Sequence, residues 1–177
     1  MSPPNDPKNA SPSAEDAALL DFVRSAFTLV RAGDSGKLRE MLDAGLPVTV
    51  RNERGDSLLM LASYYGHVDA TRLLLERGAD PAQPNDAGQT PLAGAAFKGN
   101  EAIATVLLDA GADVDGTGPD GRTPLMFAAM FDKLEMMELL IQRGADHRVR
   151  DADKRTALDY ARSMGAARAA ERLDPKP

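Results

Sequence analysis

Two histidines, His67 and His147, are the side chains of this chain best suited to acid–base or metal chemistry near neutral pH. A zinc site needs several His, Cys or carboxylate ligands at close spacing, and two isolated histidines do not make such a cluster. The chain has no cysteine, which excludes thiol chemistry and disulfides. We therefore expect no metal ion and no cofactor.

Acidic residues are numerous, but most of them fall in loop or turn positions, where Asp is favoured for backbone reasons. Their spacing also lacks the Asp-x-Asp-x-Asp-Gly order of an EF-hand. No Gly-x-Ser-x-Gly motif, phosphate-binding loop or dinucleotide fingerprint occurs, and neither histidine has a partner set for a Ser–His–Asp triad. The sequence predicts no catalytic residues, so a metal-dependent or hydrolytic enzyme is the weakest functional alternative.

The composition limits the class of partner and the compartment. The 177 residues carry a net charge of -6, which disfavours DNA or RNA as a partner. The first 14 residues are rich in Pro, Asn, Ser and charge, where a signal peptide would need an apolar run of about 7 to 15 residues. No stretch approaches the roughly 20 apolar residues that span a bilayer. We expect a cytoplasmic monomer that binds neither nucleic acid nor membranes.

A 33-residue period organises most of the chain. A fixed period of this length is typical of stacked repeat proteins. The in-frame motifs are Gly55, Gly88 and Gly121; Thr90-Pro91-Leu92 and Thr123-Pro124-Leu125; and Gly78-Ala79-Asp80, Gly111-Ala112-Asp113 and Gly144-Ala145-Asp146.

Each period predicts two helices and a loop. Thr90 can cap a helix whose first residue, Pro91, needs no free N–H, and Gly99 can end that helix in the left-handed conformation. A second helix follows, and Leu74, Leu107, Leu140 and Leu173 recur on one of its faces. A single repeat cannot bury such a face alone, so stability must come from stacking.

The turn, the Gly-x-Thr-Pro-Leu motif, the paired alanines, the Leu-Leu pair and Gly-Ala-Asp at this spacing resemble the ankyrin repeat over roughly residues 22–173. The resemblance implies an all-α solenoid of about five helix-turn-helix units with projecting hairpin-like loops. We expect an N-terminal cap over 13–51, full repeats over 52–84, 85–117 and 118–150, and a C-terminal cap over 151–173. Residues 1–12, with four prolines, and 174–177 are predicted to be tails.

Three positions of the repeat motif show how closely the chain follows the family pattern. His67 occupies the family's Gly-His position, which implies a structural role. The His that usually ends the Thr-Pro-Leu-His motif is absent, and Met60, Ala93, Met126 and Asp159 replace it. That His helps to tie neighbouring turns together in the family, so we expect looser hairpin tips here. Asp132 replaces the glycine of one inner helix, and Asp tolerates the left-handed region better than most residues.

The resemblance implies a non-catalytic scaffold that binds another protein through its concave groove. An accessory or inhibitory factor for a specific enzyme or toxin is a narrower alternative. The family's concave positions here carry Tyr64, Tyr65, Phe97, Lys98, Met130 and Phe131. The flanking loops are predicted to supply a polar rim of Arg54, Asp56, Gln89, Asp120 and Arg122.

Two alternatives remain open for this prediction. Tyr64, Phe97 and Met130 lie one repeat apart and could pack between inner helices, which would leave Tyr65, Lys98 and Phe131 as the exposed members. The arginines gather late in the chain and could steer an acidic partner to that end, although a solvated cap of mixed charge explains them as well.

Overall fold

The computed structural model describes residues 13–174, so the tail predicted over 1–12 and residues 175–177 lie outside the described part of the chain. Ten helices form within residues 13–174, together with one isolated β-bridge and no named strand. The helices are α1 (Ala14–Ala32), α2 (Ser35–Asp43), α3 (Leu58–Tyr65), α4 (Val68–Glu76), α5 (Pro91–Lys98), α6 (Glu101–Asp109), α7 (Pro124–Met130), α8 (Leu134–Gln142), α9 (Ala157–Ser163) and α10 (Ala167–Leu173).

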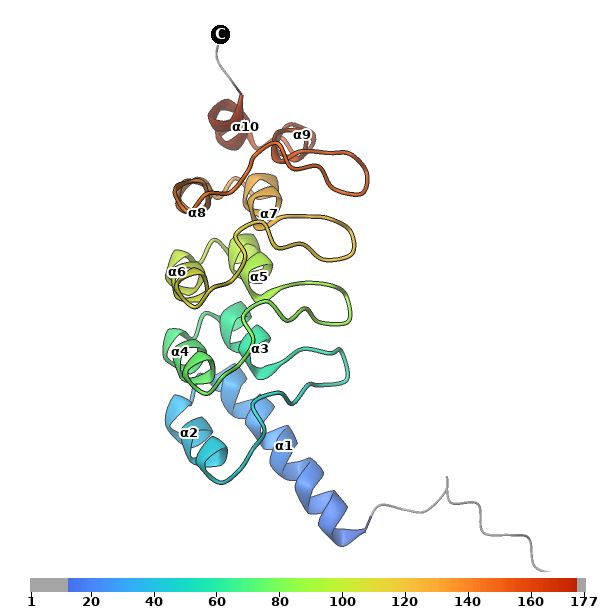
Figure 1. Ribbon diagram of the computed structural model, residues 1–177, viewed down its shortest axis with the longest axis vertical. Coiled ribbons are helices and arrows are strands. Elements are labelled where there is room, and N and C mark those ends of the chain that lie inside the picture. The colour runs from blue at the N-terminus through green and yellow to red at the C-terminus, as the bar shows by residue number, and fades with distance from the viewer. Residues whose placement is uncertain (1–12, 175–177) are drawn as a thin grey trace, which may run out of the picture.

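The helices stack as successive antiparallel pairs (Figure 1). The odd-numbered helices form an inner column and the even-numbered helices an outer column, while the loops that precede α3, α5, α7 and α9 project to one side. Consecutive helices of each column pack against one another. The prediction of an all-α repeat solenoid is confirmed.

Local capping explains where the inner helices begin and end. The Thr90 hydroxyl accepts a hydrogen bond from the N–H of Ala93 at 3.2 Å, and Ser57 does the same for Met60 at 3.0 Å. Thus Ser57 starts α3 although the Thr-Pro pair is missing there. Gly66 ends the helix with φ of 80°, and Asp132 takes the corresponding position with φ of 53°, as predicted.

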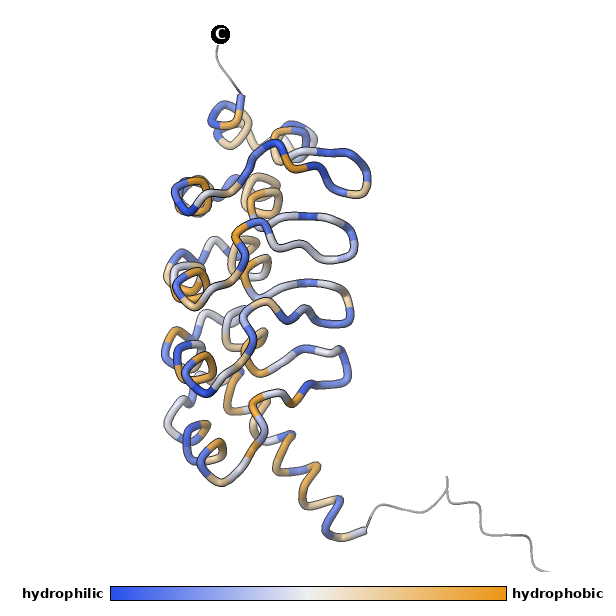
Figure 2. Tube along the Cα trace, in the orientation of Figure 1, coloured by the Kyte–Doolittle hydropathy of each residue, from blue (hydrophilic) through white to orange (hydrophobic). Residues whose placement is uncertain are grey.

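The core lies between the two columns. Leu74, Leu107 and Leu140 of the outer helices are fully buried, and the paired alanines of α5 and α7 lie beneath them with no exposed surface. Figure 2 shows hydrophobic residues along the two helix columns, whereas the projecting loops are mostly hydrophilic. Each pair therefore buries its apolar face only by stacking on its neighbours, as the repeat pattern predicted.

The first unit contains one unusually long helix, α1. Phe27 and Val30 at the C-terminal half of α1 are buried against the stack, and Leu38 of α2 is buried beside them. The N-terminal half of α1 extends beyond the stack (Figure 1), so Leu19 is exposed although it belongs to the same apolar set. Within the described residues, no helix combines the length and hydropathy needed to cross a bilayer.

The hairpin tips are tied to one another by bonds that the sequence did not predict. The N–H of Asp86 donates to the carbonyl of Arg54 at 3.2 Å, and the N–H of Ala152 donates to that of Asp120 at 3.0 Å. The in-frame residue between these two donors is Pro119, which has no N–H. A backbone hydrogen bond therefore ties the first and last of these three junctions, and Pro119 leaves the middle one without it.

Candidate binding groove

A groove of about 750 Å³ lies between the hairpin loops and the inner helices α3, α5 and α7. Its walls are mainly apolar side chains of the helices, and its loop side is polar. Six of the residues predicted from the sequence line it: Arg54, Asp56, Tyr64, Tyr65, Gln89 and Phe97. The hairpin and the inner helix of two successive repeats thus meet at one concave surface.

Four aromatic side chains form what we call the aromatic strip: Tyr64, Tyr65, Phe97 and Phe131. Their exposed fractions are 40%, 49%, 36% and 40%, respectively. The alternative that Tyr64 and Phe97 are packed away between inner helices is therefore not supported. Met130 is half-buried and packs against the core, as that alternative expected for it.

The strip is continuous across the repeats. The rings of Tyr64 and Tyr65 meet edge to face at 5.5 Å, and the rings of Phe97 and Phe131 meet in the same way at 4.7 Å. The Nζ of the exposed Lys98 lies 4.4 Å from the centre of the Tyr64 ring, close enough for a cation–π interaction. Lys98 thereby joins the aromatic residues of α3 and α5.

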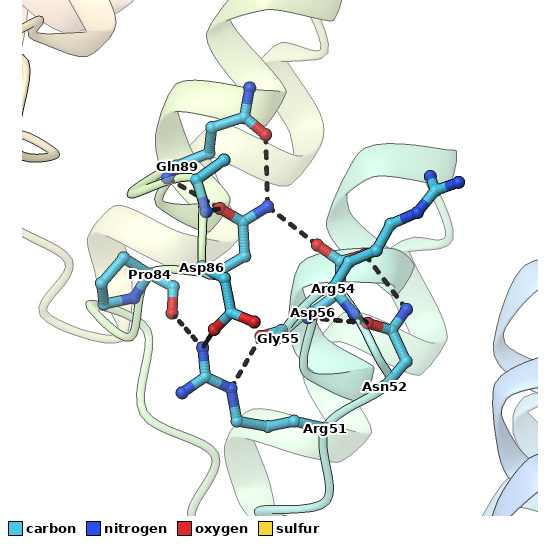
Figure 3. Close-up of polar contacts among 10 residues, drawn as sticks. Arg51, Asn52, Arg54, Gly55, Asp56, Pro84, Asp86 and Gln89 are labelled. Carbon is cyan, nitrogen blue, oxygen red and sulfur yellow. Dashed lines mark hydrogen bonds and ion pairs between the residues drawn. The ribbon is translucent and has the colours of Figure 1, made fainter.

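Hydrogen bonds fix the loop side of the groove (Figure 3). The Asn85 side chain donates to Asp56 at 2.8 Å and to Gln89 at 3.2 Å, and its own oxygen accepts from the N–H of Gln89. Arg51 donates to the carbonyls of Gly55 and Pro84, so it braces both hairpins at once. Asp56 and Gln89 of the polar rim are therefore held in place before any partner binds.

The other two predicted rim residues belong to a different part of the molecule. Arg122 pairs with Asp120 at 3.4 Å and donates from Nε to the hydroxyl of Tyr160 at 3.1 Å. Tyr160 in turn donates to the buried carboxylate of Asp151. Neither Asp120 nor Arg122 lines the groove, because Arg122 is held by the C-terminal unit.

The Asp151 network shows how burial and hydrogen bonding compete. Burial alone raises the pKa of Asp151, but the hydroxyl of Tyr160, backbone N–H groups and the charge of Arg122 outweigh it, so the pKa lies below the ordinary value. Burial, with the bond to Asp151, raises the pKa of Tyr160. This network is structural, since it joins the hairpins of the last two units.

Neither histidine lines the groove, although the ring of His67 stacks on that of Tyr65 with the ring centres 6.3 Å apart. The Nε2 of His67 lies 2.9 Å from the carbonyl oxygen of Arg31, which can only accept, so Nε2 carries the hydrogen. His67 thus ties α4 to the end of α1, in agreement with the structural role predicted for it. His147 is exposed, and its neighbour Arg148 lowers the pKa of Asp146 to about 2. Among residues 13–174, no three His, Cys, Asp or Glu side chains come together to hold a metal ion.

Each of the seven late arginines has an internal contact. Five form ion pairs with carboxylates: Arg143 with Asp109, Arg148 with Asp146, Arg162 with Asp174, Arg168 with Asp132 and Arg172 with Glu138. Arg150 donates to the carbonyl of Lys154, and Arg155 lies over the ring of Tyr160. These side chains are therefore engaged in contacts within the protein.

Sequence reasoning missed part of the groove. Met60, Leu61, Ala93, Gly94 and Phe127 also line it, together with the loop residues Glu53, Asn85, Asp86 and Ala87. A signal for the helical residues was present, because Ala93-Gly94 stands in frame with Met60-Leu61 and Met126-Phe127. Ala93 and Gly94 are thus small residues at positions where α3 and α7 carry large apolar side chains.

A stack of capped helix pairs with projecting hairpins and a concave groove defines a helical repeat scaffold. Two family models match the chain: "Ankyrin repeats (3 copies)" over residues 27–118 and "Ankyrin repeats (many copies)" over 107–161. The chain belongs to the ankyrin-repeat family. Ankyrin repeats are generally non-catalytic modules of protein–protein interaction.

A curated relative in Pseudomonas aeruginosa, described as an ankyrin repeat protein, is 52% identical to this chain over 64 residues. The match covers 36% of this chain and 37% of that protein. It therefore supports the repeat architecture and leaves the partner to be inferred from the groove.

Proposed function

We propose that this protein is a non-catalytic cytoplasmic scaffold, monomeric by itself, that binds a partner protein through its concave groove. The observation that carries the proposal is the aromatic strip, in which two aromatic side chains of α3, one of α5 and Phe131, directly after α7, are all at least one-third exposed. Contiguous exposed apolar surface with a polar rim commonly marks a protein interface.

The chemistry of the strip supports the same proposal. Tyr is among the residues enriched at interaction hot spots, because its ring buries a large area and its hydroxyl still forms hydrogen bonds. Lys98 and the preformed hairpin rim offer polar contacts on both sides of the rings. A partner that covers the strip would bury apolar area at a favourable free energy of about 25 cal/mol per Å².

Affinity capture with the wild-type protein from native cell extract, followed by mass spectrometry, would supply the partner for the test. We expect the Tyr65→Ala/Phe131→Ala double variant to bind the purified partner more weakly by over 2 kcal/mol, the usual threshold of a hot spot. This corresponds to roughly 30-fold in Kd by isothermal titration calorimetry. Circular dichroism should remain native, because both side chains are exposed.

The matched control is Arg143→Ala/Arg172→Ala, which changes the arginine-rich end and leaves the groove intact. Its Kd should stay within about threefold of wild type. A normal Kd for the aromatic variant with a large loss for the arginine variant would move the interface to the C-terminal end. If the captured partner is an enzyme or a toxin, its activity with and without this protein would test the narrower accessory or inhibitory role.

A further inference from the structure

Two small residues of α5 open a notch in the concave face. The positions of Ala93-Gly94 are filled by Met60-Leu61 in α3 and by Met126-Phe127 in α7. Leu61, Phe127 and Gly94 all line the 750 Å³ groove. At the middle repeat the groove floor is therefore made of small residues, between larger apolar side chains of the neighbouring helices.

Neither backbone conformation nor crowding requires a glycine at position 94. Gly94 lies inside α5 and is not among the glycines with positive φ. A Cβ built there would meet Tyr64 Cδ2 at 3.9 Å, an ordinary van der Waals contact. A glycine inside a helix is less stable than alanine because it loses more backbone entropy on folding. What Gly94 provides is open space.

The walls and the rim of the notch differ in character. Tyr64 and Phe97 present partly exposed rings on the helical side. On the loop side lie the carboxylates of Glu53 and Asp56, and neither has a cationic partner within the described part of the chain. Among the described residues, the Asp56 carboxylate accepts hydrogen bonds from the side-chain amides of Asn52 and Asn85 alone.

The neighbouring cations leave these two carboxylates unpaired. The Arg54 side chain extends away from the dashed contacts in Figure 3, and Arg51 is held by two carbonyls and Asp86. A carboxylate retains acceptor capacity after two hydrogen bonds. The rim can therefore attract a cation from outside.

We infer that the notch over Gly94 takes one large apolar side chain of an extended partner segment, and that a Lys or Arg adjacent to it pairs with Glu53 and Asp56. The inference rests on the proposed function and names the chemistry of the partner. A volume of about 750 Å³ accommodates such a side chain with its flanking backbone, since ligand pockets commonly span about 300–1,000 Å³.

Synthetic seven-residue Gly/Ser peptides with a central Leu-Arg, Met-Arg or Phe-Arg pair are the probes. Added to the ¹⁵N-labelled full chain at millimolar concentration, at least one should shift the amide signals of Ala93 and Gly94 in a saturable way. Replacing its apolar residue by Ala should weaken binding at least fivefold, because most of the buried apolar area is lost. Replacing Arg by Glu should also weaken it, through repulsion from Glu53 and Asp56.

The Gly94→Leu variant fills the notch with a side chain that favours a helix. We expect it to weaken binding of the responsive peptide at least tenfold, with a native ¹H–¹⁵N spectrum elsewhere. The matched control is Gly36→Leu in α2, the same change at a helical glycine whose Cβ would meet only Asp34 Oδ1, at 3.6 Å. This control should bind as wild type does.

The inference would be overturned if none of the peptides shifted the Gly94 signal, or if the responsive peptide bound the Gly94→Leu variant as tightly as wild type. Saturable shifts confined to Tyr65 and Phe131, and unchanged by Gly94→Leu, would place the peptide on the aromatic strip. That result would reject the notch as the binding site and leave the proposed function standing. The proposed function is tested by a different result: it would be contradicted if the Tyr65→Ala/Phe131→Ala variant kept full affinity for the captured partner.

Discussion

The outer and inner helix columns use their surface side chains differently. On the outer column, Arg77 pairs with Asp43 at 2.7 Å and Arg143 with Asp109 at 2.8 Å, and each pair joins two successive units. On the inner column the aromatic strip stays exposed. Charged side chains engaged within the protein are less available to a partner, so the comparison favours the inner, concave side as the interface.

The junctions between units are secured from different sides. The hairpins before α3 and α5 are joined by Arg51 and by the Asp86 N–H, whereas Pro119 removes the equivalent backbone bond at the next junction. That next junction carries the Arg143–Asp109 pair and a bond from the Asp146 N–H to the Asp115 carboxylate. These two junctions thus draw their polar contacts from opposite sides of the stack.

The largest expected effect separates stability from binding. Leu107→Ala in α6 removes a fully buried side chain from the core and leaves the groove surface unchanged. We expect a loss of about 2–5 kcal/mol in the free energy of unfolding, from lost burial and the cavity that remains. Urea unfolding measures this loss of stability. The variant, where folded, should keep the wild-type Kd for the partner. A loss below about 1 kcal/mol would contradict the assigned core.

The next effect tests whether the last hairpin is structural. Tyr160→Phe removes the hydroxyl that donates to the buried Asp151 and accepts from Arg122. We expect a loss of about 1–3 kcal/mol in the free energy of unfolding, because a buried carboxylate loses a donor. Tyr65→Phe is the control and should change stability little, since that side chain is half exposed. Equal stability of both variants would show that the network contributes nothing.

A smaller effect is an increase in stability. Gly94→Ala should stabilise the protein by about 0.5–1 kcal/mol, because alanine is the better helix former and its Cβ fits without a clash. The contrasting control is Gly66→Ala, which should destabilise it, since Gly66 has φ of 80° and a Cβ there would approach Asn100 at 2.8 Å. Thermal unfolding of the two variants distinguishes the signs. Destabilisation by Gly94→Ala would mean that the glycine serves the backbone after all.

The smallest effect concerns the ion pairs of the outer column. Arg143→Gln should cost about 0.2–1 kcal/mol, because the Asp109 partner is largely exposed and water screens the pair. A double-mutant cycle with Asp109→Asn isolates the pair energy, which should fall further in 1 M salt. A coupling energy above about 2 kcal/mol would indicate that these pairs govern the stacking.

Much of the fold followed from local signals in the sequence. Thr90, Pro91 and Gly99 act through neighbouring backbone, so their in-frame spacing predicted helix bounds well. The exposed aromatic residues were also found, because their positions relative to the helix-ending glycines place them on one face. The local chain determines both features.

Other features depend on contacts between units and were missed for that reason. The partner of Arg122 is Tyr160, 38 positions away, and no local pattern distinguishes it from a free rim residue. The ties between hairpin tips likewise require knowledge of how the loops align. The in-frame comparison shows small residues at Ala93 and Gly94. Only the structure shows that neither a positive φ nor crowding requires a glycine at position 94.

The most direct test of the concave interface is a chemical-shift map of the ¹⁵N-labelled full chain with its captured and purified partner. We expect the largest changes on residues 53–65, 86–98 and 127–131, the ranges that contain the groove-lining hairpins and helices and the aromatic strip. Residues of α8 and α10 should change little. Changes concentrated between Arg143 and Arg172, with the aromatic strip unaffected, would contradict the account.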